Sequence, residues 1–116
     1  LERLRSVVDV AVLNGAGVVG LAALVAADLS EAGFEVAGTG NDVRFDRQET
    51  IISYRAGDVE AEPIAFLLVD LLPGARVEAV DRDLELDGGA VSIVVVLGLD
   101  RVPDDGADDA DPGEDG

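Results

Sequence analysis

Three glycines near the N-terminus have the spacing of a nucleotide-binding loop. Gly15, Gly17 and Gly20 form a G-x-G-x-x-G pattern between an apolar run and a helical pattern. Such a loop lets the backbone approach a pyrophosphate closely, and the start of the helix offers free N–H groups and the positive end of its dipole. One hypothesis is therefore a small nucleotide-binding domain, whose melting temperature rises with saturating NAD or ATP.

Three features of the sequence count against a nucleotide. The acid that would hold the ribose hydroxyls is missing from residues 38–40, and Asp42 comes only after an expected turn. Asn14 lies just before the glycines, where a polar side chain commonly bonds the backbone of a turn. A doubly wound sheet also needs more βα units than the roughly 60 residues after the second expected strand provide. The competing interpretation is a structural turn that brings helix and sheet close together.

Acids in the second half of the chain resemble a calcium loop in part. Asp81, Asp83 and Glu85 have the one-three-five spacing of such a loop. Leu86 stands where the loop needs glycine, and Ser92 stands where the bidentate Glu belongs. A solvated loop is the simpler interpretation, and we expect no metal site.

The side chains that most enzymes use are absent. The chain contains no His and no Cys, which removes the usual zinc ligands, thiolate nucleophiles and the commonest general base. Glu60 and Glu62, beside Pro63, could form a carboxylate pair for acid–base catalysis. Acids in the first turn of a helix are equally explained by the helix dipole. We therefore expect no catalytic residue, no cofactor and no enzymatic activity.

Candidate contact residues lie at the ends of the expected elements. Asn14, Asn41, Arg44 and Arg55 are our prediction for a partner-contact surface, because binding groups concentrate on loops held by rigid elements. Arg44, Arg47 and Arg55 surround the longest internal loop and could receive an anionic partner. Ion pairs with neighbouring acids are the alternative for these arginines.

The charge balance excludes whole classes of partner. The net charge is −17, from 25 acids against eight basic residues, all of them Arg. Nucleic-acid binding requires the opposite sign, so we expect none. Anionic membrane surfaces are disfavoured for the same reason, so membrane association would require a separate anchor.

Periodicity in the first half predicts a strand, a helix and a second strand. Residues 7–13 are apolar and rich in Val, as in a strand covered on both faces. Residues 18–32 show helical spacing of Leu, Val and Ala, and residues 34–36 form a second strand. The glycine-rich segment 38–42 predicts a turn, followed by a polar loop to residue 48.

The second half repeats the pattern and adds a last strand. Residues 50–55 alternate as in a third strand, and a helix follows from about residue 60 to residue 72. Residues 76–80 form a short fourth strand, and the apolar run 91–97 forms a buried fifth strand. A polar connection over residues 81–89 joins these last two strands.

The order β-α-β-β-α-β-β predicts an α/β domain of the α+β type. Short crossovers of this kind place both helices on one face of a mixed sheet, which gives a two-layer sandwich. An exposed strand edge, such as that of the fourth strand, would allow self-association, so the oligomeric state stays open.

The composition changes at both ends of this domain. Residues 103–116 lack bulky apolar side chains and are rich in acids, which predicts a disordered acidic tail. The chain has no apolar run of the roughly 20 residues that span a bilayer, and it opens on Leu1 without an initiator Met. We expect residues 1–6 to lead from an upstream membrane anchor and residues 7–102 to form the domain.

Several short segments together resemble the LytR C-terminal domain family. They follow one another from about Val8 to Arg101. The segments are Val12-Leu13-Asn14-Gly15-Ala16-Gly17-Val18, Gly20-Leu21-Ala22, Ala32-Gly33-Phe34-Glu35-Val36, Gly40-Asn41, Tyr54-Arg55-Ala56-Gly57, Leu72-Pro73-Gly74-Ala75 and Val95-Val96-Leu97-Gly98-Leu99-Asp100. Pro63 departs from the pattern, because related helices continue with Ala at this place.

The resemblance implies a role in the bacterial cell envelope. Domains of this family follow the catalytic domain of LytR-CpsA-Psr cell-wall ligases, or stand alone behind one transmembrane helix in actinobacterial proteins. The absence of a ligase domain and of Lys favours the stand-alone form, tethered outside the plasma membrane. The implied function is support of envelope integrity by binding a ligase, another envelope protein or cell-wall glycan. The family supplies no catalytic residues.

Overall fold

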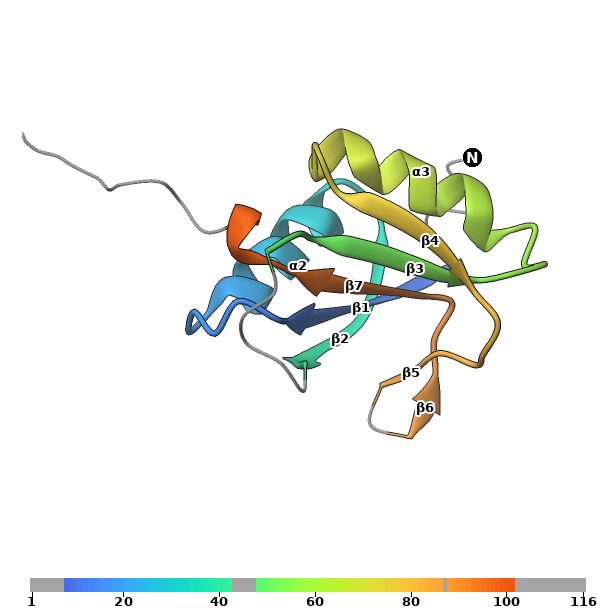
Figure 1. Ribbon diagram of the computed structural model, residues 1–116, viewed down its shortest axis with the longest axis horizontal. Helices are drawn as coiled ribbons and strands as arrows, with labels where there is room; N and C mark the ends of the chain where they lie inside the picture. Colours follow the sequence, from blue (N-terminus) through green and yellow to red (C-terminus); the bar gives the residue numbers. More distant parts are fainter. Residues whose placement is uncertain (1–7, 43–47, 87, 102–116) are drawn as a thin grey trace, which may run out of the picture.

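The computed structural model describes residues 8–42, 48–86 and 88–101 (Figure 1). The N-terminal half forms strand β1 (Asp9–Asn14), helix α2 (Leu21–Glu31) and strand β2 (Glu35–Asn41). Strand β3 (Ile51–Arg55), helix α3 (Ala61–Leu71) and strand β4 (Arg76–Val80) repeat this order. A hairpin of β5 (Glu85–Leu86) and β6 (Gly89–Ala90), strand β7 (Ile93–Leu97) and a 3-10 turn (Leu99–Arg101) follow.

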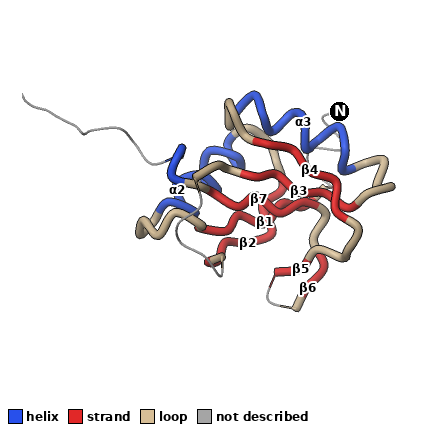
Figure 2. Tube along the Cα trace, in the orientation of Figure 1, coloured by secondary structure: helices blue, strands red, loops and turns tan. Residues whose placement is uncertain are grey.

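The described strands form a five-stranded mixed sheet in the order β2-β1-β7-β3-β4 (Figure 2). Strand β1 is parallel to both β2 and β7, and β3 is parallel to β4. The last strand, β7, joins the halves because it pairs antiparallel with β3. The two strand–helix–strand units therefore lie side by side with opposite directions.

Both helices cover the same face of this sheet. Helix α2 packs on β1 and β2, and α3 packs on β3 and β4. Alternate residues of each strand point toward the helices, and most of these residues are aliphatic. Its fully buried larger side chains are Val10, Val12, Leu29, Ile52, Ile64, Leu68, Ile93, Val95 and Leu97. The predicted two-layer sandwich with both helices on one face is confirmed.

The opposite face of the sheet has a smaller apolar cluster. Leu84 is buried there against Ala11 and Val94, with Leu86 packed at its border. The segment before β7 was predicted to be only a polar connection, and this was incomplete. The apolar pair at residues 84 and 86 anchors the β5–β6 hairpin to the sheet.

Strand β2 is longer than the sequence predicted. The expected turn over residues 38–42 was wrong, because β2 continues in register with β1 as far as Asn41. A Cβ atom on Gly38 would lie 2.8 Å from Leu86 Cδ2. The glycine thus makes room for Leu86, and this edge strand packs without large side chains of its own.

Helix boundaries follow from local backbone chemistry. Helix α2 starts at Leu21 and not at residue 18, because Gly20 adopts a left-handed conformation with φ of 83°. Pro63 lies in the first turn of α3, where its missing N–H costs nothing. The Asp58 carboxylate accepts hydrogen bonds from the backbone N–H of Glu60 at 3.2 Å and of Ala61 at 3.1 Å. Neither described helix is long and apolar enough to cross a membrane.

Candidate ligand-binding cleft

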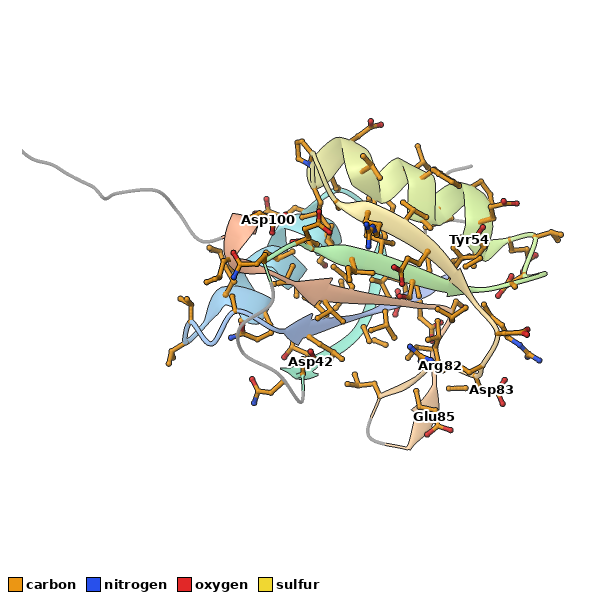
Figure 3. All side chains as sticks on the ribbon, in the orientation of Figure 1. Asp42, Tyr54, Arg82, Asp83, Glu85 and Asp100 are labelled. Atoms are coloured by element: carbon orange, nitrogen blue, oxygen red, sulfur yellow. The ribbon has the colours of Figure 1, made fainter. Side chains whose placement is uncertain are left out.

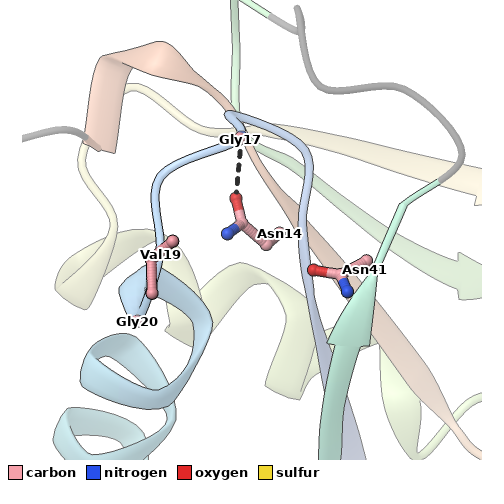
Figure 4. A pocket seen from close by; sticks show the side chains of 5 residues that line it. All are labelled: Asn14, Gly17, Val19, Gly20 and Asn41. Carbon is pink, nitrogen blue, oxygen red and sulfur yellow. Dashed lines mark hydrogen bonds between the residues drawn. The ribbon is translucent and has the colours of Figure 1, made fainter.

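The carboxyl ends of the neighbouring strands β1 and β2 lie at the same end of the sheet. Asn14 and Asn41 are partners in the strand register, and the loop from Gly15 leads from this point into α2. A cleft of about 500 Å³ opens here (Figure 4). Its lining residues are Asn14, Gly17, Val19, Gly20 and Asn41.

The Asn14 side chain is part of the scaffold of this cleft. It is only 6% exposed, and its Oδ1 atom accepts hydrogen bonds from the N–H of Ala16 at 3.0 Å and of Gly17 at 3.1 Å (Figure 4). Its Nδ2 atom donates to the Val18 carbonyl oxygen at 2.6 Å. The Gly15 N–H donates to the Leu97 carbonyl oxygen at 2.9 Å. Three successive N–H groups of the loop are therefore bonded within the protein.

These bonds weaken the nucleotide hypothesis on new grounds. A phosphate-binding loop needs free backbone N–H groups, and those of residues 15–17 already have partners. The earlier objection about the missing acid was wrong, because β2 ends at Asn41 and Asp42 follows it directly. The Asp42 N–H donates to the Asn14 carbonyl oxygen at 3.0 Å. The bonded loop is the stronger objection, and it supports the structural-turn interpretation.

The described lining of the cleft is uncharged. Among the described residues that line the cleft none is charged, and they offer amide groups, glycine backbone and one apolar side chain. That apolar side chain, Val19, is 99% exposed although it is fully aliphatic. Sequence reasoning missed Val19, because a valine before a helical pattern suggests core. This apolar side chain is therefore fully accessible at the mouth of the cleft.

The four predicted contact residues do not gather at one place. Asn14 and Asn41 meet at the cleft, whereas Arg44 and the neighbouring Arg47 lie outside the described residues. Arg55 ends β3, which runs opposite to β7 and hence to β1, so it lies at the other end of the sheet. There it forms an exposed ion pair with Asp83 at 3.1 Å. For Arg55 this agrees with the alternative of an ion pair with a nearby acid, and the alternative is untested for Arg44 and Arg47.

The acids with the partial calcium-loop spacing lie before β5 and in it. Asp83 faces Arg55, and Glu85 belongs to β5 (Figure 3). Among the residues that the structure describes, no group of three or more Asp or Glu could hold a metal ion.

Glu62 has a structural partner. Its carboxylate accepts a hydrogen bond from the Tyr54 hydroxyl at 3.2 Å, which ties α3 to β3 (Figure 3). Burial raises the pKa of Tyr54 above its ordinary value, and the bond to Glu62 and its negative charge raise this pKa further. The Glu62 carboxylate thus has a structural role, whereas the carboxylate that caps the start of α3 is that of Asp58.

A second polar cluster fixes the end of β7. The Thr50 hydroxyl donates to Asp100 Oδ1 at 2.7 Å and accepts from the Gly98 N–H at 3.2 Å. The Thr50 N–H donates to Asp100 Oδ2 at 3.1 Å. A Cβ atom on Gly98 would lie 2.5 Å from the carbonyl carbon of Glu49. The segment from Leu97 to Asp100 thus fixes the end of β7 against the start of β3.

The sequence of the folded region matches a known family. Residues 7–100 match the family model described as LytR cell envelope-related transcriptional attenuator, and the chain belongs to this family. The resemblance stated from the sequence is confirmed. No curated protein sequence is significantly similar to the chain.

Two solved structures share the fold. The soluble domain of a conserved hypothetical secreted protein from Mycobacterium marinum, the Rv2700 ortholog, matches with a TM-score of 0.63 and 26% sequence identity over 84% of this chain. The match spans 62% of that solved domain, which is therefore longer than the part shared with this chain. The C-terminal domain of RV0431 matches with a TM-score of 0.53 and 32% identity, over 78% of this chain and 71% of that domain.

Proposed function

We propose that this chain is a non-enzymatic binding module of the bacterial cell envelope, which acts outside the plasma membrane. Three observations support the proposal. The chain belongs to a cell envelope-related family, its fold is shared with a domain of a secreted mycobacterial protein, and the described residues that line the cleft at Asn14 and Asn41 are uncharged. The module belongs to a membrane-anchored protein that supports envelope integrity.

The bonded loop at Asn14 is the observation that carries this proposal. A catalytic site needs a nucleophile, acid or base at the reacting atoms, and the described lining of the cleft consists of amides, glycine backbone and Val19. A phosphate site needs the N–H groups that Asn14 and Leu97 already bond. The remaining chemistry is recognition of an uncharged surface.

The partners that fit are a LytR-CpsA-Psr ligase, another envelope protein or cell-wall glycan. The family description mentions transcription, but a net charge of −17 opposes contact with the phosphates of DNA. The proposed organisation is an N-terminal lead over residues 1–6, the domain over residues 7–102 and an acidic tail over residues 103–116. The lead connects to an anchor in the membrane.

An NMR titration of the isotope-labelled chain tests the proposal. Soluble peptidoglycan fragments and a purified ligase catalytic domain are added in separate experiments. We expect one of them to shift the amide signals around the cleft, from Asn14 to Gly20 and near Asn41. If neither ligand shifts the amide signals at concentrations up to about 1 mM, the Kd range of weak recognition, both are excluded as partners.

Matched variants make the titration specific. Val19→Ser and Asn41→Ala change exposed side chains of the cleft, and Arg55→Ala changes an exposed side chain at the other end of the sheet. We expect each cleft variant to weaken binding by about fivefold, the equivalent of roughly 1 kcal/mol. Equal weakening by Arg55→Ala would show that the cleft is not the contact surface.

A nucleotide remains a testable alternative because of the glycine spacing. NAD or ATP at about 100 times its Kd would stabilise the chain by about 2.7 kcal/mol and raise its melting temperature by several degrees. We expect no change with either compound, because the N–H groups of the loop are bonded. A reproducible rise would overturn the uncharged-ligand proposal.

A further inference from the structure

The edge of the sheet at β2 carries little charge compared with the rest of the chain. Glu35, its first residue, is the only charged residue of β2, whereas the shorter β4 at the opposite edge contains Arg76 and Glu78. Proteins commonly protect edge strands with charges, prolines or bulges, because an open edge pairs readily with another chain. The one irregularity of the β1–β2 register precedes residue 38. Residues 38–41 therefore form a regular edge without such protection.

The backbone of this edge has groups directed away from the sheet. The Asp42 N–H points to β1, where it donates to the Asn14 carbonyl oxygen at 3.0 Å. In a parallel pair, successive residues direct their N–H and C=O groups to opposite sides. The backbone groups of Thr39 and Asn41 thus point outward, and no described strand pairs with β2 on that side (Figure 2).

A hollow lies beside the same residues. It has a volume of about 340 Å³ and is bounded by Thr39 and Asn41 of β2 and by Ala22 and Ala23 of α2. Its described lining residues include no charged side chain and no side chain larger than Asn. Outward backbone groups and a shallow groove with short walls are what an added strand requires, since the backbone supplies affinity and alternate side chains enter the groove.

We propose that β2 takes up an extended peptide segment of a partner protein as a sixth strand of the sheet. The segment is uncharged or basic and has small side chains, because the groove is shallow and the chain carries a net charge of −17. The same charge opposes a second copy of this chain as the occupant. This proposal rests on the proposed function, and it names the form in which a protein partner binds.

A synthetic peptide probe tests strand addition directly. The probe is an eight-residue peptide of alternating threonine and valine with lysine at each end, and its control is the same peptide with alternate backbone amides methylated. We expect the probe to shift the amide signals of Thr39, Gly40 and Asn41 and to slow their hydrogen exchange at least fivefold. The methylated peptide keeps the side chains but loses backbone donors, so it should not bind.

Two proline variants identify the edge. Thr39→Pro removes an outward N–H of β2 and leaves the bonds to β1 intact. Ala79→Pro is the matched control on β4, because the Arg76 N–H and the Val80 carbonyl oxygen bond toward β3 and leave Ala79 directed outward. We expect Thr39→Pro to weaken the probe at least tenfold and Ala79→Pro to leave its Kd unchanged.

Several results would overturn the proposal. These are equal binding of the methylated peptide, binding that survives Thr39→Pro, signals that shift at β4, or no binding at millimolar probe. Sedimentation of the chain alone as a dimer through β2 would also overturn it, in favour of a second copy. If ligase or glycan shifts the cleft signals while the probe fails, the binding module stands and only strand addition is wrong.

Discussion

At the residue scale, the Asn14 amide is a structural group at the mouth of the cleft between β1, β2 and α2. Its three hydrogen bonds hold the loop before α2, and its side chain is buried. Asn14→Ala leaves two N–H groups and one carbonyl oxygen without their partner. We expect a loss of about 2–3 kcal/mol in the free energy of unfolding, measured by urea denaturation with an unchanged m value.

Asn41 provides the matched control for this measurement. It has the same side chain at the paired position of β2, but it is exposed. We expect Asn41→Ala to change the free energy of unfolding by less than about 0.5 kcal/mol. Equal losses in both variants would contradict the structural role of Asn14.

Gly98 is required by the close approach of two backbone segments. A Cβ atom there would lie 2.5 Å, 2.6 Å and 2.7 Å from the carbonyl carbon, oxygen and nitrogen of Glu49. The backbone must move to admit it, which disturbs the Thr50–Asp100 bonds as well. We expect Gly98→Ala to lower the free energy of unfolding by about 2–3 kcal/mol.

Replacement of Gly89 by Ala is the control, because it measures the general effect of replacing a glycine without the clash at Gly98. Its added Cβ would lie 3.5 Å from the nearest atom, the Leu86 carbonyl oxygen, which is an ordinary contact. We expect Gly89→Ala to be within about 0.5 kcal/mol of the parent chain. A tolerated Gly98→Ala would show that the end of β7 can shift without loss.

At the scale of elements, the contact between α3 and β3 makes the free energy of unfolding depend on pH in the alkaline range. The pKa of Tyr54 is raised in the folded state, first by burial and then by Glu62. Above the ordinary tyrosine pKa of about 10, the unfolded chain loses a proton that the folded chain retains. Stability therefore falls as pH rises from this value toward the raised pKa, and it is unaffected below it.

The single tyrosine makes this contact measurable without ambiguity. The chain has one Tyr, no Trp and no Cys, so phenolate absorbance reports on Tyr54 alone. We expect Glu62→Gln to lower the pKa of Tyr54 and yet leave it above the ordinary value, because burial, the larger cause, remains. Tyr54→Phe should abolish the alkaline loss of stability. A titration at the ordinary pKa in the parent chain would contradict the burial of the hydroxyl.

The sequence predicted the elements that have strong periodicity. Five strands of the sheet, both helices and their common face follow from apolar spacing, because a packed core requires that spacing. Strand β2 was predicted too short, since Gly38 and Gly40 carry no side chain whose pattern could be recognised. Their role depends on Leu86, which approaches from a distant part of the chain.

Only those parts of the candidate site that depend on local chemistry were predictable from the sequence. Asn14 was assigned to a turn from its chemistry, and that assignment is confirmed by its bonds. The position of Arg55 depends on the antiparallel pairing of β3 with β7. Periodicity shows that a segment is a strand and carries no information about its direction in the sheet. Directions are set by packing across the whole domain.

At the scale of the whole molecule, charge repulsion opposes the folded state. The described ion pairs of Arg55 and Arg76 are exposed and contribute little, whereas the net charge is −17. Salt screens repulsion over distances beyond about 10 Å at 0.1 M. We expect the melting temperature to rise with sodium chloride concentration.

A shortened chain gives the control. Seven of the acids lie in residues 102–116, and a chain that ends at Arg101 has a net charge of −10. We expect this variant to keep the amide signals of the domain and to show a smaller rise in melting temperature with salt. A decrease with salt in either chain would show that specific ion pairs outweigh repulsion.

The central place of β7 determines when the protein can become folded. Val10 pairs with Ile93, so the two halves of the sheet are joined by a strand that lies 83 positions later in the chain. A chain that emerges from its N-terminus, whether from the ribosome or through an export channel, exposes both unjoined halves until β7 follows. Each half then presents an open apolar strand to its surroundings. Folding is completed only after almost the whole domain has emerged, and a chain cut before β7 leaves β1 and β3 without their common partner.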